Sequence, residues 1–257
     1  MTIPLRMRGI KAAPSSAHGP IPFTRLVRVE WAKATDTRAA RWLLALVALS
    51  TAAMMLAPIL APTRFDQTSS SYLEVTAVTL VILLPVVTIL MLTGEWSQRT
   101  AFTTFTQEPR RVRVVNAKLA ASMVLGSGAS VFGGVVTAAG LGLAAASGRA
   151  VEANLTAGAI TGYLLFVLLN VLAGVALGAL LQSSATAIAA SFALPAALAV
   201  IGTASTLVAD WIDMSTWNWL LENQWGGHVP QISVSVLFWV AVPLAAGVVR
   251  TIRRDVA

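Results

Sequence analysis

Residues Gly94–Lys118 read GEWSQRTAFTTFTQEPRRVRVVNAK and separate two long apolar segments of the chain. No other internal interval is as charged, and its charged residues are Glu95, Arg99, Glu108, Arg110, Arg111, Arg113 and Lys118. A short amphipathic piece with Phe102 and Phe105 comes first. The chain then breaks at Glu108, because the residue before a proline is pushed out of the helical region. Since proline is favoured at the first helical position, Pro109 is expected to start the basic run that follows. The pattern predicts a short surface helix that offers two aromatic side chains and a basic cluster to the cytosol.

The composition of the chain indicates a membrane protein. Of its 257 residues, 56% are hydrophobic and 11% are charged, and the mean hydropathy is +0.75. A soluble domain carries about 25% charged residues, so a water-soluble fold of this size could not bury so much apolar surface. Cysteine is absent, which excludes disulfides, thiolate metal sites and a cysteine nucleophile.

Six apolar runs have the span length of about 20 residues that a helix needs to cross a hydrocarbon core of about 30 Å. They are Trp42–Leu60, Leu73–Leu92, Leu119–Ala146, Leu155–Leu181, Thr186–Val208 and Ile232–Val249. The third and fourth runs are long enough to tilt. The sequence therefore predicts an all-α polytopic membrane protein with one transmembrane domain over residues 23–257, preceded by a flexible cytoplasmic tail over residues 1–22.

The distribution of Lys and Arg predicts the orientation of the spans. All but Arg64 and Arg149 lie in the N-terminal segment, in the loop after the second span or in the C-terminal tail. Because cytoplasmic flanks are rich in Lys and Arg, both termini and the central loop are expected in the cytoplasm. The net charge of +7 is then mainly a topology signal, and no nucleic-acid partner is expected.

The segment Phe23–Arg38 has helical periodicity. Its apolar face includes Trp31, and its opposite face carries Arg25 and Arg28. This suits a helix that lies in the cytoplasmic interface with its tryptophan at headgroup depth. Glu30 falls on the apolar side, where it is expected to pair with Lys33 or to face another protein surface. A basic flank that only orients the first span is the alternative interpretation.

Prolines and small residues are the informative features inside the spans. The prolines are Pro85, Pro195 and Pro243. Each removes a backbone hydrogen bond and is expected to kink its helix. Two small-xxx-small pairs, Gly158 with Gly162 and Gly174 with Gly178, allow close helix approach. Packing within the chain is their expected role, and a subunit interface is the alternative.

Ionisable side chains are nearly missing from the apolar runs, with Glu74 at the outer end of the second. Asn170, near the middle of the fourth run, is expected to bond to a neighbouring helix rather than to a substrate. Because no chain of buried carboxylates or histidines could carry protons or bind sodium, a transporter driven by an ion gradient is not expected.

The linker Ala209–Pro230, ADWIDMSTWNWLLENQWGGHVP, holds half of the eight tryptophans of the chain. They are Trp211, Trp217, Trp219 and Trp225. Tryptophan favours the headgroup layer, so this linker is expected to re-enter the outer leaflet as short helices before the sixth span. An interfacial belt and an outer gate over a substrate exit are both consistent with it.

The sequence offers little support for enzymatic chemistry. It has no zinc-type His/Glu pair, no nucleophile elbow and no phosphate-binding GxxxxGK[ST] loop. An intramembrane enzyme that uses Asp210, Asp213 and His228 at the outer face is the least favoured alternative. Neither a metal site nor a bound cofactor is expected.

Six spans with both ends inside, an interfacial N-terminal helix and a charged loop after the second span resemble the type-2 ABC transporter permeases. These are membrane subunits of exporters for drugs, antibiotics, lipids and polysaccharides. The similarity runs from about Phe23 onward, and its strongest local matches are Glu95, Thr100, Pro109 and Lys118. The chain departs from the family at Arg99, where glycine is frequent, and at Phe102 and Phe105, where leucines are common.

The resemblance implies that Gln98–Thr106 is a cytoplasmic coupling helix, seated in a groove of a separate ABC ATPase subunit that binds ATP and Mg. The residues it assigns to this coupling are Glu95, Arg99, Thr100, Phe102, Phe105, Pro109, Arg110, Arg111 and Lys118. Of these, it implies that Glu95, Arg110, Arg111 and Lys118 anchor the ends of the helix.

The resemblance also implies an assembly and a cargo. Two permease copies, identical or different, would pair around a path lined by the second and fifth spans. A small hydrophobic or amphipathic cargo would leave the cytoplasm or inner leaflet of a bacterial plasma membrane, as in multidrug efflux. The kinked spans would pass the ATPase motion to the outer gate, with Phe23–Arg38 as the connecting helix. A non-conducting sensor or immunity subunit shares every one of these features and is the alternative.

Overall fold

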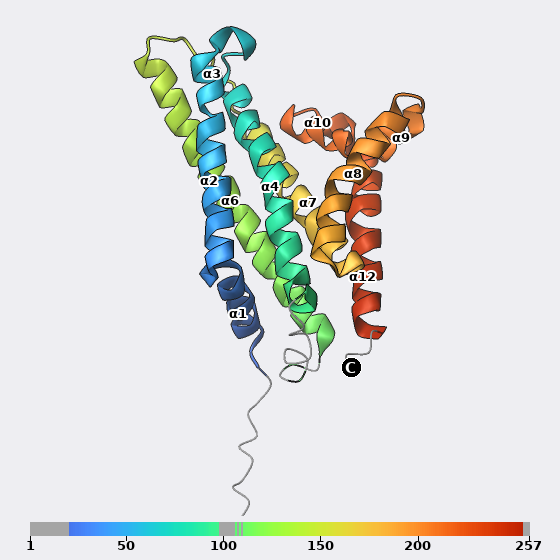
Figure 1. Cartoon of the computed structure of the whole chain (residues 1–257). Helices are drawn as coiled ribbons and strands as arrows, with labels where there is room; N and C mark the ends of the chain where they lie inside the picture. The colour runs from blue at the N-terminus through green and yellow to red at the C-terminus, as the bar shows by residue number, and fades with distance from the viewer. Residues whose placement is uncertain (1–20, 98–105, 107, 109, 254–257) are drawn as a thin grey trace, which may run out of the picture.

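The computed structural model describes residues 21–97, 106, 108 and 110–253. These residues form helices, with no β-strand among them beyond an isolated pairing of Thr68 with Glu152 (Figure 1). Six helical segments in this part of the chain are long and apolar enough to cross a membrane. That architecture confirms the predicted all-α class and is compatible with a multi-pass membrane protein. Residues 1–20 of the predicted tail and nearly all of the predicted coupling helix lie outside the described residues, with Arg99, Thr100, Phe102, Phe105 and Pro109 among them.

The N-terminal helix and the first span are separated by a single extended residue. Helix α1 (Phe23–Asp36) ends at Thr37, whose hydroxyl oxygen accepts a hydrogen bond from the Ala40 amide and caps α2 (Arg38–Met54). Helix α3 (Leu56–Leu60) and the 3-10 turn η1 (Pro62–Arg64) follow α2. The first membrane-length segment therefore begins at Arg38, four residues before the predicted span.

Helices α4 (Ser69–Ser97) and α7 (Ala157–Leu181) form the centre of the bundle, and more than half of the most apolar stretch of each is buried. Glycines let the two backbones approach closely. A Cβ at Gly174 would lie 2.9 Å from the Pro85 Cα, and one at Gly178 would lie 3.2 Å from the Leu92 Cβ. The predicted role of this pair in packing within the chain is confirmed.

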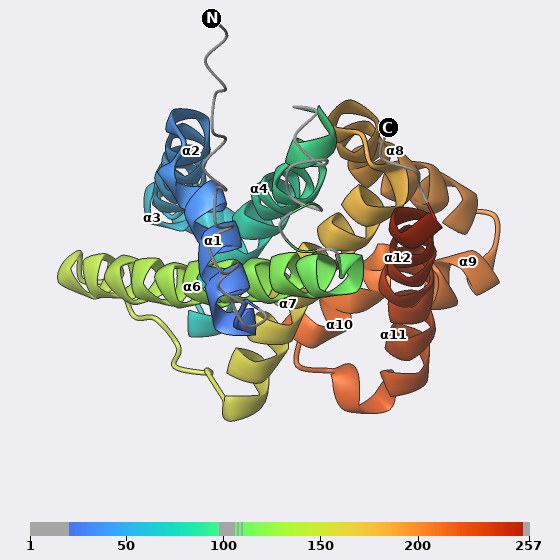
Figure 2. The same cartoon turned by 90° about the horizontal axis from the view of Figure 1, so that it is seen from below.

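Helix α6 (Arg111–Ala146) is the longest element, with 36 residues and therefore a length of about 54 Å. The sequence predicted that this helix starts at Pro109, whereas α6 begins two residues later, at Arg111. Figure 2 shows α6 along much of its length while α12 points toward the viewer, so α6 is tilted across the bundle. Helix α1 lies against α6 in the same view, and the two helices are in contact.

The predicted fifth span is too long at its outer end. Helix α8 (Ser184–Gly202) stops before Thr203, and a separate helix α9 (Thr206–Trp211) begins after Ser205, whose hydroxyl oxygen accepts from the Val208 amide. Hydropathy alone does not reveal this break, because the first turn of α9 is itself apolar. Only 6% of the span of α8 is buried, so this helix lies at the edge of the bundle.

Short elements join α8 to the last span. They are α9, the 3-10 turn η2 (Met214–Trp217), α10 (Asn218–Leu221) and the 3-10 turn η3 (Trp225–Gly227). We call residues 203–228 the outer segment. Helix α10 packs against α7, where a Cβ at Gly162 would collide with the Leu220 carbonyl oxygen and one at Gly158 would collide with the Asn223 side chain. This second glycine pair thus also packs within the chain.

The sixth span is a helix with a wider turn inside it. It consists of α11 (Val229–Val236), the π-helical turn η4 (Leu237–Ala241) and α12 (Val242–Arg253). Pro243 follows this turn and has no N–H to donate to the Trp239 carbonyl four residues earlier. A local π-helical turn next to a proline can give the freed backbone carbonyl group another hydrogen-bond partner. Pro85 and Pro195 lie inside α4 and α8, as predicted.

The helix ends separate into two groups along the bundle (Figure 1). Helix α1, the end of α4, the start of α6 and the end of α12 lie together, and we call this the basic end. Helices α3, α9 and α10 lie at the opposite, outer end. This grouping agrees with the predicted topology, and that the basic end faces the cytoplasm stays a prediction from the Lys and Arg distribution.

Candidate functional site

Four charged side chains from three helices meet at the basic end. Glu30 and Lys33 belong to α1, Glu95 to α4 and Lys118 to α6, and we call them the ion network. Lys118 Nζ lies 2.8 Å from Glu30 Oε2 and 3.4 Å from Glu95 Oε1. Lys33 Nζ lies 2.6 Å from Glu30 Oε1 and 2.8 Å from Glu95 Oε1. Each carboxylate therefore faces both ammonium groups.

Burial makes the ion network unusual for a charged cluster. The Glu30, Glu95 and Lys118 side chains are each less than 10% exposed, whereas that of Lys33 is 45% exposed. Lys118 Nζ also donates to the Met91 carbonyl oxygen at 3.2 Å. Two positive and two negative charges balance, so burial leaves no net charge without compensation.

The pKa of Lys33 reflects two opposing influences. Partial burial of its ammonium group works to lower that pKa. Hydrogen bonds to Glu30 and Glu95, together with attraction to their charges, outweigh burial. The pKa of Lys33 consequently lies above its ordinary value, and the residue is a cation at physiological pH.

The ion network explains two features of the sequence. Glu30 falls on the apolar face of α1 because that face packs against α6, and the predicted pairing with Lys33 is confirmed. Glu95 and Lys118, two of the four predicted anchors of the coupling segment, are brought together although they stand on opposite sides of it. Arg25 and Arg28 are exposed and Trp31 is half-buried against the core, as the amphipathic pattern predicts.

A second set of contacts holds the start of α6. Arg113 Nη1 pairs with Glu108 Oε2 at 2.8 Å, and Arg113 Nη2 donates to the Ile21 carbonyl oxygen before α1. Arg111 Nη1 donates to the Thr251 carbonyl oxygen of α12 at 2.8 Å, while the predicted anchor Arg110 is exposed. The start of α6 is thus tied to the residue pair before α1 and to α12. Sequence reasoning missed the Glu108–Arg113 pair, for which the acid–proline–basic order was the available signal.

The four tryptophans of the outer segment occupy different environments. Trp217 is fully buried, whereas Trp211 is 38% exposed. Trp219 stacks on His228 with ring centroids 3.8 Å apart, and Trp225 is half-buried. One of the four is therefore a core residue, and the gate role predicted for all of them stays a prediction.

Asp213 anchors the outer segment to the last span. Its Oδ1 accepts from the Ser215 amide at 2.8 Å and caps η2. Its carbonyl oxygen accepts from Ser235 Oγ at 3.2 Å, and Trp239 Nε1 donates to the adjacent Ile212 carbonyl oxygen at 2.8 Å. Asp213 is only 6% exposed, although the sequence pattern suggested a solvated edge.

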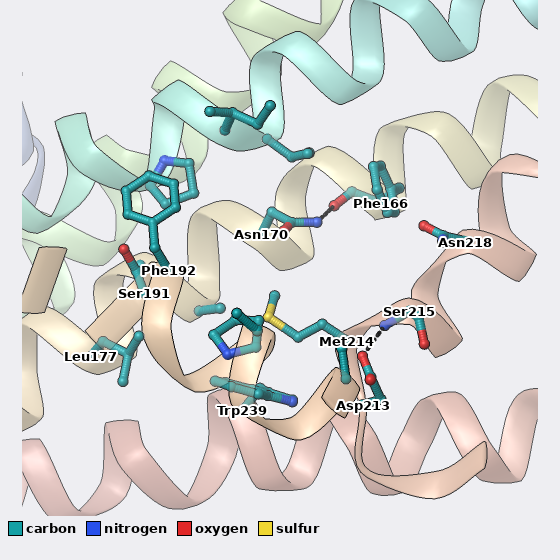
Figure 3. A pocket seen from close by; sticks show the side chains of 18 residues that line it. Phe166, Asn170, Leu177, Ser191, Phe192, Asp213, Met214, Ser215, Asn218 and Trp239 are labelled. Carbon is teal, nitrogen blue, oxygen red and sulfur yellow. Dashed lines mark hydrogen bonds between the residues drawn. The ribbon is translucent and has the colours of Figure 1, made fainter. Parts of the chain in front are cut away.

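A cavity of about 380 Å³ lies between the central helices, α8 and the outer segment (Figure 3). Its walls include Pro85 of α4, Asn170 of α7 and Pro195 of α8, and Asp213 and Trp239 complete it. The cavity lies within one chain, and its walls come from the second, fourth, fifth and sixth spans and the outer segment. A path between two copies, lined by the second and fifth spans, stays a prediction.

Asn170 corrects one sequence prediction. Its Nδ2 donates at 2.9 Å to the Phe166 carbonyl oxygen of its own helix. The prediction that Asn170 bonds to a neighbouring helix is therefore wrong. The carbonyl group four residues earlier is within reach of the amide, and the other side of Asn170 is the cavity rather than a facing helix (Figure 3).

An outer-face enzyme site is not assembled in the described part of the chain. No hydrogen bond or ion pair among these residues joins Asp210, Asp213 and His228, and Asp210 is exposed while Asp213 is buried. The described residues also contain no cluster of three or more His, Asp or Glu side chains that could hold a metal ion.

Comparisons of the chain with protein-family models and with curated proteins gave no match. Its function is therefore inferred from the two sites themselves, the ion network and the cavity.

Proposed function

We propose that this chain is the transmembrane permease subunit of an ATP-driven ABC exporter. It would move a hydrophobic or amphipathic cargo out of the cytoplasm or inner leaflet of a bacterial plasma membrane, with both termini cytoplasmic. A separate ATPase subunit would bind ATP and Mg and dock on Gln98–Thr106, and a second permease copy would complete the complex. The observation that supports the proposal is the ion network, which joins the last turn of α4 to α6 on either side of the proposed coupling helix.

The ion network gives this segment mechanical properties that suit coupling. Glu95 lies in the last turn of helix α4, which precedes the segment, and Lys118 lies in helix α6, which follows it. Lys118 pairs with Glu30 of α1 directly, and Glu95 is linked to Glu30 through Lys33 and Lys118. A force applied between them would therefore move the ends of α4, α6 and α1 together. Helix α4 continues through Pro85 to the cavity, so the same force would reach the cavity wall.

Phe102→Asp and Phe105→Asp test the docking step. Each is expected to abolish co-purification of the ATPase with the tagged chain from native membranes, because a carboxylate would enter an apolar groove unpaired. Hydrolysis of Mg-ATP by the purified material should fall with it, by at least tenfold. Phe102→Leu and Phe105→Leu, which keep an apolar side chain, are the matched controls and should retain both. If the ATPase stayed bound and active in each of the two aspartate variants, the proposal would be contradicted.

A further inference from the structure

We infer that the cavity is a binding site for an amphipathic cation, a molecule with an apolar aromatic or aliphatic body and a single positive charge. As a statement about cargo this rests on the proposed exporter function, and as a statement about binding it is independent of any ATPase. Asp213 and the aromatic wall of the cavity are the features that select for such a ligand.

Asp213 supplies a buried negative charge without a buried cation to balance it. Its side chain borders the cavity, and the residue is 6% exposed. Oδ1 accepts from the Ser215 amide, while the second carboxylate oxygen has no hydrogen-bond partner among the residues the structure describes. No Lys, Arg or His in that part of the chain forms an ion pair with Asp213. A buried carboxylate without a cationic partner raises the free energy of the folded chain, and a cationic ligand would compensate its charge.

The remaining walls suit the apolar body of such a ligand. Phe166, Phe192 and Trp239 contribute aromatic rings, and Met214 contributes an adaptable thioether side chain (Figure 3). Aromatic faces attract cations, tryptophan most strongly. None of the lining residues is a Lys, Arg or His, so nothing in the cavity favours an anion.

Size and position agree with a small-molecule site. The cavity volume of about 380 Å³ falls within the roughly 300–1,000 Å³ that such sites occupy. Pro85, Asn170 and Pro195 come from the middle of their helices, which places the cavity between the spans. Asp213 reaches this cavity from the outer segment, where it caps η2.

The competing explanation is that Asp213 only caps the turn η2. Capping needs an acceptor oxygen but no charge, and asparagine caps a helical turn about as well as aspartate. Asp213→Asn therefore keeps the structural role and removes the charge. Asp210→Asn makes the same chemical change three residues earlier at an exposed position, and it is the matched control.

The experiment measures equilibrium binding of radiolabelled tetraphenylphosphonium to the purified chain in lipid nanodiscs, without ATP or ATPase. The wild-type chain and Asp210→Asn should bind it equally, and Asp213→Asn should bind about tenfold or more weakly. Tetraphenylborate, which has the same shape and the opposite charge, should bind the wild-type chain weakly and should gain affinity in Asp213→Asn.

Three results would overturn the inference. They are phosphonium binding unchanged in Asp213→Asn, an equal loss in Asp210→Asn, and no saturable binding to the folded wild-type chain. Should Asp213→Asn fail to fold, Ala199→Lys on the peripheral helix α8 places a cation in the cavity and should abolish phosphonium binding; undiminished binding would overturn the inference equally. If the chain binds phosphonium in this way but no ATPase co-purifies with it from native membranes, this inference stands while the exporter proposal fails.

Discussion

Lys118→Met is expected to destabilise the folded chain by about 3–5 kcal/mol, because it leaves the Glu30 and Glu95 carboxylates buried with a single ammonium group between them. Removing one partner of a buried ion pair is far more damaging than removing one at the surface, since the remaining charge cannot recover its hydration. The measurement is the free energy of unfolding in mixed micelles of increasing SDS content, followed by tryptophan fluorescence.

Lys33→Met is the matched control for this prediction. It removes the same charge from the same two carboxylates, but the Lys33 side chain is 45% exposed. Its loss should therefore cost less than the loss of Lys118, because water can reach the two carboxylates where the half-exposed ammonium group stood. Adding Glu30→Gln and Glu95→Gln to Lys118→Met should restore much of the lost stability, because no buried charge then lacks a partner. Equal losses for the two lysine variants would show that the ion network is hydrated and that its burial carries no energetic weight.

The second large effect is expected at Gly162, where Gly162→Val should destabilise the chain by about 3 kcal/mol. Its Cβ would collide with the Leu220 carbonyl oxygen of α10. A backbone oxygen cannot rotate aside as a flexible side chain can, so the outer segment would have to move away from α7. The free energy of unfolding in mixed micelles reports the cost.

Gly134→Val provides the comparison within another span. A Cβ at Gly134 of α6 would meet nothing within 4 Å, so this variant should stay within about 0.5 kcal/mol of wild type. If the two valine variants unfolded at the same SDS content, close packing of α10 on α7 would be contradicted.

The sequence predicted features that depend on local pattern. Span length and hydropathy identified six membrane-length helices, and the i,i+3 spacing identified the pairing of Glu30 with Lys33. The partner that buries this pair, Lys118, lies 88 residues from Glu30. Hydropathy contains no information about which helices become neighbours, so the full ion network could not be derived.

The cavity illustrates the same limit. Asp213 in its tryptophan-rich linker reads as a solvated edge, yet it is only 6% exposed and its main-chain carbonyl oxygen accepts a hydrogen bond from Ser235 of the last span. Asn170 reads as a link to a neighbouring helix, yet a carbonyl group of its own helix satisfies its amide. Both residues line a space whose shape arises from five elements, and no single stretch of sequence encodes such a shape.

The peripheral position of α8 determines how a ligand would reach the cavity. This helix supplies one cavity wall through Phe192 and Pro195, and hardly any of its span is covered by the rest of the chain. A molecule dissolved among the acyl chains would meet this wall first and could arrive sideways without passing through water. Apparent affinities referred to the aqueous concentration would then rise with the lipid–water partition coefficient of the ligand, even when its intrinsic affinity for the cavity is constant.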